Sequence, residues 1–218
     1  HTGSRHVRWE PETNRIHETK GKKQMEILMF RHFATAGNLE KRYIGTTDEP
    51  ILPVSSVSGV PEVEIVLASP LLRCRETAGL LYPRLDPVLI EGFRECDFGA
   101  FEGKNYRELT GDQDYQAWID SGGILPFPGG ESMASFTART KEAFQRAVED
   151  LMAGEIRRAA MIAHGGTLMA ILSSCGIPKQ EYYEWNCGNG CGYRVRIEED
   201  LWKTGKKECK VEEQLCVF

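Results

Sequence analysis

The chain has 218 residues, of which 41% are hydrophobic and 27% are charged, and its formal net charge is −5 at pH 7. These proportions are close to those of globular proteins and exclude a disordered, collagen-like or low-complexity chain. No apolar stretch approaches the ~20 residues of a membrane-spanning helix. The excess of acidic residues argues against a nucleic-acid partner. We therefore expect the protein to bind neither a membrane nor nucleic acid.

Residues 1–24 are predicted to lie outside the folded domain. They are polar and basic, with no periodic apolar pattern and no apolar core of a secretory signal. We interpret them as a disordered N-terminal extension or a tag remnant, and we expect the domain to span residues 25–218. Within that domain the only histidines are His32 and His164.

The seven cysteines are odd in number, and no two of them stand in a C-x-x-C spacing. This pattern predicts ordinary buried thiols in a reducing cytoplasm. A metal cluster around Cys187 and Cys191 is the alternative, but no histidine follows them to complete a ligand set.

From Met25 onward, short apolar runs alternate with segments of helical periodicity. The apolar runs predict buried parallel strands over Glu26–Phe30, Glu64–Ala68 and Ala159–Ala163. Helical spacing and cap residues, such as Ser69 before the first helix, predict helices over residues 71–82, Asp114–Asp120, Ser132–Met152 and Thr167–Cys175, with a Gly- and Pro-rich loop over residues 121–132. Alternation predicts strands near a sheet edge over Tyr193–Ile197 and Cys209–Phe218. This order indicates an α/β protein with helices on both faces of a mostly parallel sheet.

Groups suited to an anion follow each of the three buried strands. Arg31 and His32 follow the first, Ser69 and Arg73 follow the second, and His164 with two glycines follows the third. In open α/β sheets the carboxyl ends of the strands form the crevice where ligands bind. Two guanidinium groups, two imidazoles and helix N-termini at one place predict a phosphate site.

Five motifs resemble those of the histidine phosphatase superfamily. They are RHFATAGN, SPLLRCRETA, ECDFGAFEG, PGGES and AHGG, and the resemblance runs from Met25 to about Ile197. Within that superfamily, KRYIGTTDEP, ECDFGAFEGKNYRELTG and DYQAWIDSGGILPFPGGES are most similar to the alpha-ribazole phosphatase group of cobalamin biosynthesis. The resemblance implies a phosphoglycerate mutase-like three-layer α/β/α sandwich. It also implies a cytoplasmic phosphomonoesterase that acts on a small phosphorylated metabolite, for which alpha-ribazole 5'-phosphate is a candidate.

The resemblance assigns roles around the phosphoryl group. His32 would be the nucleophile that forms a phosphohistidine, and His164 would donate to the phosphoryl oxygens. Arg31 and Arg73 would grip the same oxygens with their planar guanidinium groups. Asn38 would add a neutral donor. These groups meet a dianion without a divalent ion, so neither a metal nor an organic cofactor is expected.

Other residues would line the site or assist the chemistry. Gly45 and the backbone at Gly165 would lie against the site, where only glycine allows a close main-chain approach. Glu95 matches the family's acid, which protonates the leaving alcohol, and its pKa would have to be raised for that task. Asp97 is the rival carboxylate, and we expect it to be structural. The sequence also contains Glu102 and Glu131, and we expect both to brace loops.

The chain departs from the family pattern in two places. Phe33 stands where the family has glycine, which places a bulky residue beside the nucleophile. The segment over residues 51–64 is short, so the helix usually found there must be very short and one sheet face less covered. Two other functions stay open. A phosphoglycerate mutase-type transfer is disfavoured by the short span between Gly103 and Gly129, and Phe33 motivates a non-catalytic phospholigand-binding protein.

Overall fold

The computed structural model describes residues 21–218, so residues 1–20 of the expected extension lie outside the described part. The first strand begins at Gln24, one residue before the expected start of the domain. The strands are β1 (Gln24–Arg31), β2 (Ile65–Ala68), β3 (Val88–Leu89), β4 (Arg158–Ala163), β5 (Gly176–Ile177), β6 (Cys191–Glu198) and β7 (Cys209–Cys216). The α-helices are α1 (Ala36–Leu39), α2 (Leu72–Leu81), α3 (Gln113–Asp120), α4 (Met133–Ala153), α5 (Gly165–Cys175) and α6 (Glu199–Lys203), and the 3₁₀ helices are η1 (Glu91–Phe93), η2 (Gly99–Phe101) and η3 (Tyr182–Trp185). No helix of this described part is long and apolar enough to span a membrane.

The strands form one sheet in the order β3-β2-β4-β1-β6-β7-β5. β3, β2, β4 and β1 are parallel neighbours, and β6 is antiparallel to both β1 and β7. The prediction of a mostly parallel sheet is therefore confirmed, because β6 alone runs against the others in the described sheet. The two strands expected near a sheet edge, β6 and β7, are third and second from the edge that β5 forms, and each pairs with a strand on both sides. The short strands β3 and β5 were not predicted.

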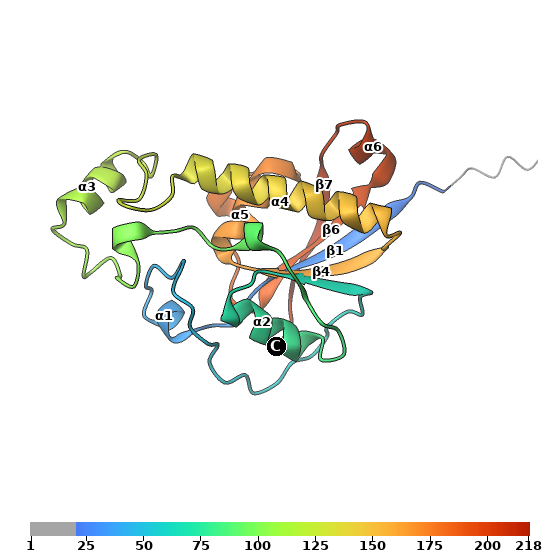
Figure 1. Cartoon of the computed structure of the whole chain (residues 1–218), viewed down its shortest axis with the longest axis horizontal. Coiled ribbons are helices and arrows are strands. Elements are labelled where there is room, and N and C mark those ends of the chain that lie inside the picture. Colours follow the sequence, from blue (N-terminus) through green and yellow to red (C-terminus); the bar gives the residue numbers. More distant parts are fainter. Residues whose placement is uncertain (1–20) are drawn as a thin grey trace, which may run out of the picture.

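Helices α4 and α5 cover one face of the sheet, and α2 covers the other, which gives three layers (Figure 1). The alternation of β1 explains why both faces need cover. Ile27 and Met29 belong to the core cluster under α4 and α5, whereas Leu28 and Phe30 belong to the cluster under α2. Helix α4 ends before Gly154, as predicted.

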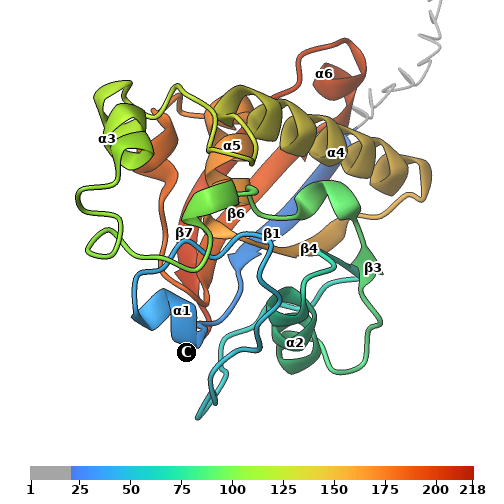
Figure 2. The same ribbon diagram turned by 60° about the vertical axis from the view of Figure 1, so that its left-hand side comes forward.

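The face beneath α2 is completed by an irregular segment in place of a second helix. Residues 51–63 form no helix and run beside α2 (Figure 2). Their valines pack against the core at every third position, and these are Val54, Val57, Val60 and Val63. The expected very short helix is therefore absent from this segment. Side chains of the coil cover the sheet where the helix was expected.

The cysteines differ from the sequence prediction in one respect. Cys191 and Cys216 form a disulfide between directly opposed positions of β6 and β7. The remaining five, Cys74, Cys96, Cys175, Cys187 and Cys209, are free and buried, as expected of ordinary thiols. The expectation of free thiols throughout was wrong because antiparallel pairing brings two residues together that are 25 apart in sequence.

Replacing Cys191 and Cys216 together by alanine is expected to lower the free energy of unfolding by about 3 kcal/mol, because the bond closes a loop in the unfolded chain. Urea unfolding with and without a dithiol reductant measures this difference. The reductant should destabilise the unmodified protein and leave the double variant unchanged. Identical unfolding curves for the unmodified protein under both conditions would contradict the prediction.

Candidate active site

The carboxyl ends of three neighbouring parallel strands place the predicted residues together. The N–H of His32 donates to Ala163 O (3.0 Å), and the N–H of Ser69 donates to Ile162 O (2.9 Å), so the chain leaves β1, β2 and β4 at one level. The rings of His32 and His164 lie edge to face, with centroids 5.2 Å apart. The two histidines predicted from the strand ends therefore lie together. Of the predicted residues, Arg31, His32, Asn38, Glu95 and Gly165 line the neighbouring pocket, whereas Arg73 and His164 do not.

His32 is buried and held in one orientation. Its Nδ1 lies 2.7 Å from Phe33 O. A carbonyl oxygen only accepts, so Nδ1 carries the hydrogen and Nε2 is left with a free lone pair. Burial and the nearby Arg73 and Arg31 charges lower the pKa of His32 to about 3. The ring is therefore neutral at physiological pH, which is the state a nucleophilic imidazole requires.

His164 caps the N-terminus of α5 and is fully buried. Its Nε2 lies 2.8 Å from the hydroxyl of Ser69. Burial, followed by the charge of Arg73, lowers the pKa of His164 well below its usual value. The predicted role of Ser69 as a helix cap was wrong: the N-cap of α2 is Leu71, and the carboxylate of Asp48 accepts from the N–H of Leu72 (2.6 Å).

Arg31 and Arg73 are each fixed through their terminal nitrogens. Arg31 Nη1 donates to Cys187 O (2.7 Å), and Arg73 donates to Thr47 O (2.7 Å) and Gly45 O (3.0 Å). The Nε atoms of both arginines are buried and have no partner among the described residues. Each guanidinium thus has one buried N–H donor that the described residues leave without an acceptor.

The two predicted glycines, Gly45 and Gly165, allow close approach of different groups. A Cβ at Gly45 would lie 1.9 Å from Cys96 O, so its close approach is to the backbone of the Glu95 loop, and Gly45 is not among the residues that line the pocket. A Cβ at Gly165 would lie 3.2 Å from the guanidinium of Arg31. Gly165 therefore allows Arg31 to lie flat against the start of α5.

Glu95 lies in the loop between η1 and η2 and lines the pocket. Its Oε1 accepts from the N–H of Cys96 and its Oε2 from the N–H of Gly166, both at 3.0 Å. Burial raises the pKa of Glu95, and these two hydrogen bonds oppose the shift without cancelling it. Asp97 instead accepts from the N–H of Gly99 (2.9 Å) and does not line the pocket.

The other two carboxylates brace loops, as expected. Glu102 accepts from the backbone N–H groups of Gly45 (2.8 Å) and Thr47 (2.9 Å). Glu131 forms an ion pair with Arg139 (2.8 Å) and accepts from the N–H of Asp97 (3.0 Å). Neither carboxylate is among the residues that line the pocket.

Phe33 is accommodated outside the pocket. Its ring belongs to the core cluster under α2 and is not among the pocket-lining residues. It packs against Gly190, where a Cβ would lie 2.8 Å from the ring and where φ is +73°. Gly190 therefore provides the space that Phe33 needs beside the nucleophile.

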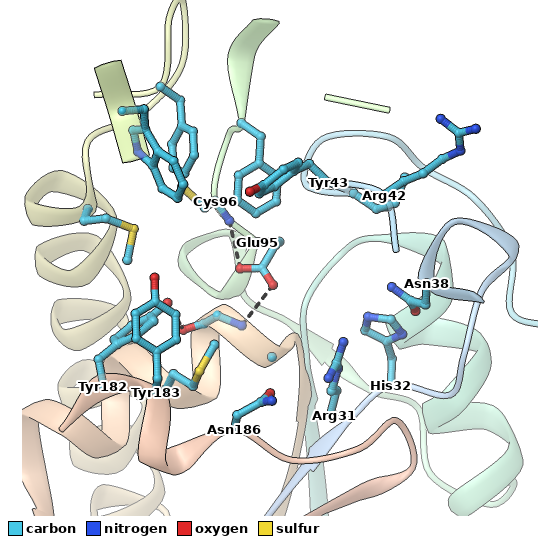
Figure 3. Close-up of a pocket in the computed structure, with 18 residues that line it drawn as sticks. Arg31, His32, Asn38, Arg42, Tyr43, Glu95, Cys96, Tyr182, Tyr183 and Asn186 are labelled. Carbon is cyan, nitrogen blue, oxygen red and sulfur yellow. Dashed lines mark hydrogen bonds between the residues drawn. The ribbon is translucent and has the colours of Figure 1, made fainter. Parts of the chain in front are cut away.

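A pocket of about 300 Å³ opens beside these groups. Figure 3 shows Arg31, His32 and Asn38 grouped on one side of it and Tyr182 and Tyr183 on the other. Much of the lining is aromatic or carries a thioether, and we call these residues the aromatic wall: Tyr43, Phe98, Trp118, Phe127, Met133, Met169, Tyr182 and Tyr183. Sequence reasoning missed this wall, since its residues come from several separate helices and loops. Within residues 21–218 no group of three or more His, Cys, Asp or Glu side chains is placed to hold a metal ion.

Comparisons with known proteins find relatives in sequence and in fold. A Hydrogenobacter thermophilus protein whose name refers to phosphoserine phosphatase is 28% identical over 158 residues, which are 67% of this chain and 76% of that protein. The crystal structure of phosphoglycerate mutase from Thermus thermophilus has a TM-score of 0.60 and 27% identity, and the match covers 89% of this chain and 100% of that one. Alpha-ribazole phosphatase from Shigella flexneri shares the fold, with a TM-score of 0.69, 20% identity and coverage of 86% and 95% of the two chains.

The family itself follows from a match over most of the chain. The model of the histidine phosphatase superfamily (branch 1) matches residues 27–209. That range contains every predicted site residue, from Arg31 to Gly165. The chain belongs to the histidine phosphatase superfamily and has a phosphoglycerate mutase-like fold.

Proposed function

We propose that this protein is a phosphomonoesterase that works through a phosphohistidine on His32. The observation that carries the proposal is the neutral, buried His32 with Nδ1 committed to Phe33 O. The ring of His164 lies 5.2 Å from that of His32, and the buried Nε donors of Arg31 and Arg73 have no partner among the described residues. A phosphoryl dianion supplies the acceptors that these donors lack.

The reaction has two halves. In the first, Nε2 of His32 bonds to phosphorus while the bond to the leaving alcohol breaks, and Glu95 gives its proton to the leaving oxygen. In the second, water attacks phosphorus, the carboxylate of Glu95 takes the water's proton, and the P–N bond breaks to release inorganic phosphate. His164, Arg31 and Arg73 stabilise the charge on the phosphoryl oxygens in both halves.

The substrate would carry an uncharged aromatic group. Arg31 and Arg42 are the cationic side chains that line the pocket in the described part of the chain. Arg42 forms ion pairs with Glu40 and Glu108, each at 2.5 Å, and Figure 3 shows its guanidinium turned away from His32. A carboxylate on the substrate would thus have no free cation to meet, whereas an aromatic group would contact the aromatic wall.

These properties favour alpha-ribazole 5'-phosphate, a benzimidazole riboside, over phosphoglycerate or phosphoserine. The mutase alternative is further disfavoured because the span between Gly103 and Gly129 contains one short helix, α3. The ring of Phe33 lies outside the pocket, so it gives no support to a non-catalytic binding protein.

A panel of phosphomonoesters tests the proposal. We expect alpha-ribazole 5'-phosphate to exceed phosphoglycerate and phosphoserine in kcat/KM by about 10-fold or more, because a buried unpaired carboxylate is costly. Tyr183→Ala removes a ring from the pocket rim, where Tyr183 is 70% exposed. It should raise the KM for the ribazole ester by roughly 3- to 10-fold.

The matched control is Tyr106→Ala, because Tyr106 is also exposed and lies outside the pocket lining. This variant should leave the KM unchanged. Preference for a carboxylated ester would contradict the proposed substrate class, and no turnover of any ester would contradict the proposed phosphatase.

A further inference from the structure

We propose that Asn189 is a positioning residue that orients the side-chain amide of Asn38 toward the phosphoryl group. Asn189 lies in the turn between η3 and β6 and is not among the residues that line the pocket. The inference rests on the proposed function, because it assigns Asn38 to phosphate binding, and it adds a residue that the family motifs do not mark in this sequence.

The contacts of Asn38 decide which way its amide faces. Its Oδ1 accepts from the N–H of Thr35 (3.1 Å) and from Nδ2 of Asn189 (3.2 Å). An amide oxygen has two lone pairs, so both are used. The NH₂ group of Asn38 is therefore directed to the pocket, where it can donate to an anion.

Both hydrogens of the Asn189 amide are also assigned. Nδ2 donates to His32 O (3.0 Å) as well as to Asn38 Oδ1. Asn189 thus joins the backbone of the nucleophile to the proposed neutral donor. Without Asn189, only the N–H of Thr35 would donate to Oδ1 of Asn38. The Asn38 amide would then be held less firmly and could turn its oxygen toward the phosphate.

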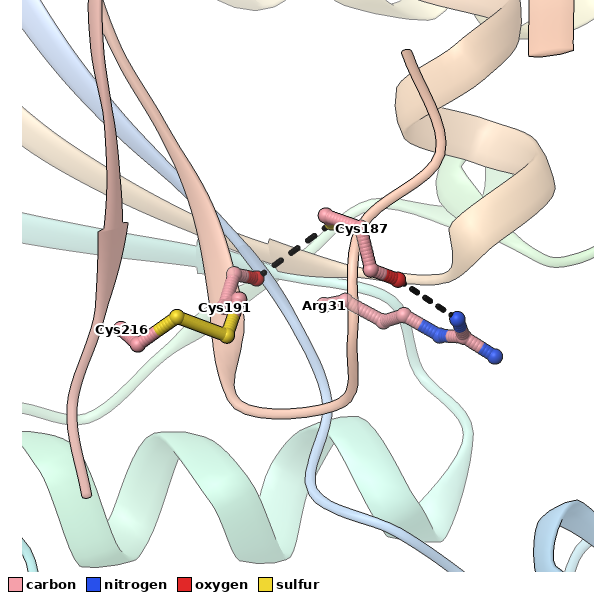
Figure 4. The surroundings of a disulfide bond; sticks show 4 residues. All are labelled: Arg31, Cys187, Cys191 and Cys216. Carbon is pink, nitrogen blue, oxygen red and sulfur yellow. Dashed lines mark hydrogen bonds between the residues drawn. A yellow bond between two sulfur atoms is a disulfide. The ribbon is translucent and has the colours of Figure 1, made fainter. Parts of the chain in front are cut away.

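The turn that carries Asn189 is anchored on both sides. Cys187 O accepts from Arg31 Nη1 (2.7 Å), and the N–H of Gly190 donates to Arg31 O (3.0 Å). The next residue, Cys191, is joined to Cys216 by the disulfide, and Figure 4 shows this bond and the Arg31 contact at the two ends of the turn. Asn189 is therefore held at a fixed distance from His32 and Asn38.

A double-mutant cycle on inorganic phosphate binding tests the inference. Calorimetry would give the Kd of phosphate for the unmodified protein, Asn189→Ala, Asn38→Ala and the double variant. We expect each single variant to weaken binding by about 10-fold, the size of one hydrogen bond to a charged group. The double variant should bind no more weakly than Asn38→Ala, because Asn189 acts through Asn38.

Asn189→Asp gives a second measurement. An ionised carboxylate only accepts, so it would attract the NH₂ of Asn38 and turn Oδ1 toward the anion. This variant should bind phosphate more weakly than Asn189→Ala does. Asn105→Asp is the matched control, since the amide of Asn105 donates at an exposed turn to Glu40 O (3.4 Å), and it should leave Kd within about twofold of the unmodified value.

The outcomes separate this inference from the proposed function. The role of Asn189 would be overturned if the fold-increases in the Kd for phosphate multiplied in the double variant. It would also be overturned if Asn189→Ala left that Kd unchanged, even where p-nitrophenyl phosphate is hydrolysed. Phosphate binding that follows the expected cycle in a protein without turnover would overturn the phosphatase and keep the positioning role. Unfolding midpoints of all variants show whether any loss comes from misfolding.

Discussion

Replacing His32 by alanine is expected to abolish the phosphoenzyme and to lower turnover of p-nitrophenyl phosphate by roughly 10³- to 10⁶-fold, the range seen when a nucleophile is removed. The reason is geometric, because Nδ1 of His32 is committed to Phe33 O and its Nε2 is free. His164 cannot replace it, since its Nε2 already lies 2.8 Å from the hydroxyl of Ser69. Trapping with a radiolabelled ester, followed by acid and base treatment, measures the adduct, which should be acid-labile and base-stable.

A protein lacking residues 1–20 is the control, because it removes His1, His6 and His17 and leaves both β1, which begins at Gln24, and the domain histidines. It should form the adduct at the unmodified level. An adduct that maps to any residue other than His32 would contradict the assignment.

The pH dependence adds an independent check on the nucleophile. The pKa of His32 is lowered to about 3, so the imidazole becomes charged and inactive only when the pH falls toward that value. Loss of kcat/KM between about pH 7 and pH 5 should therefore follow the second ionisation of the phosphate ester, which is near ~6. An acid limb that stays fixed when esters of different phosphate pKa are compared would show that a group of the protein titrates in this range, which would contradict this prediction.

The strand ends of this fold could be predicted from the sequence because their signals are local. Each apolar run is short and ends at a charged or polar residue, so Arg31, His32 and His164 could be assigned to one edge of the sheet. Parallel strands must present their carboxyl ends together, and the pairing of β1 with β4 does so. The signals for helix ends are also local, and Gly154 directly after α4 is an example.

The rest of the site depends on contacts between distant segments. Tyr43, Trp118 and Tyr183 reach one pocket from three separate segments, and no periodicity in the sequence relates them. Cys216 meets Cys191 only because the antiparallel pairing of β6 and β7 places the two residues opposite each other. The fold accommodates the Phe33 ring only because Gly190 has no side chain, and no local sequence pattern connects these two residues. These are consequences of packing, which propensity and spacing do not encode.

Replacing Glu95 by glutamine is expected to slow the release of an alkyl alcohol by about 10²- to 10⁴-fold, the usual contribution of a general acid. Release of p-nitrophenol in the first turnover should fall much less, because that anion leaves with little need of a proton. Burial raises the pKa of Glu95, so the proton is present to higher pH than in an ordinary glutamate and is lost as the pH rises through the raised value. Glutamine keeps the two contacts in part, since its one amide oxygen can still accept from Cys96 or Gly166.

The measurement must isolate the first chemical step, because Glu95 would also activate water in the second. Rapid-quench release of each alcohol in a single turnover does this, and a pH series should lose its alkaline limb for the alkyl ester in Glu95→Gln. Asp97→Asn is the matched control: Asp97 accepts from the N–H of Gly99 and does not line the pocket, so its variant should keep the difference between the two leaving groups. Equal losses on both esters in Glu95→Gln would reject Glu95 as the acid, and a leaving-group-dependent loss in Asp97→Asn would transfer the role to Asp97. Gly166 lies in the first turn of α5, and His164 is the N-cap residue of the same helix. The hydrogen bond from the N–H of Gly166 to Glu95 therefore fixes the position of the proposed acid relative to the second imidazole.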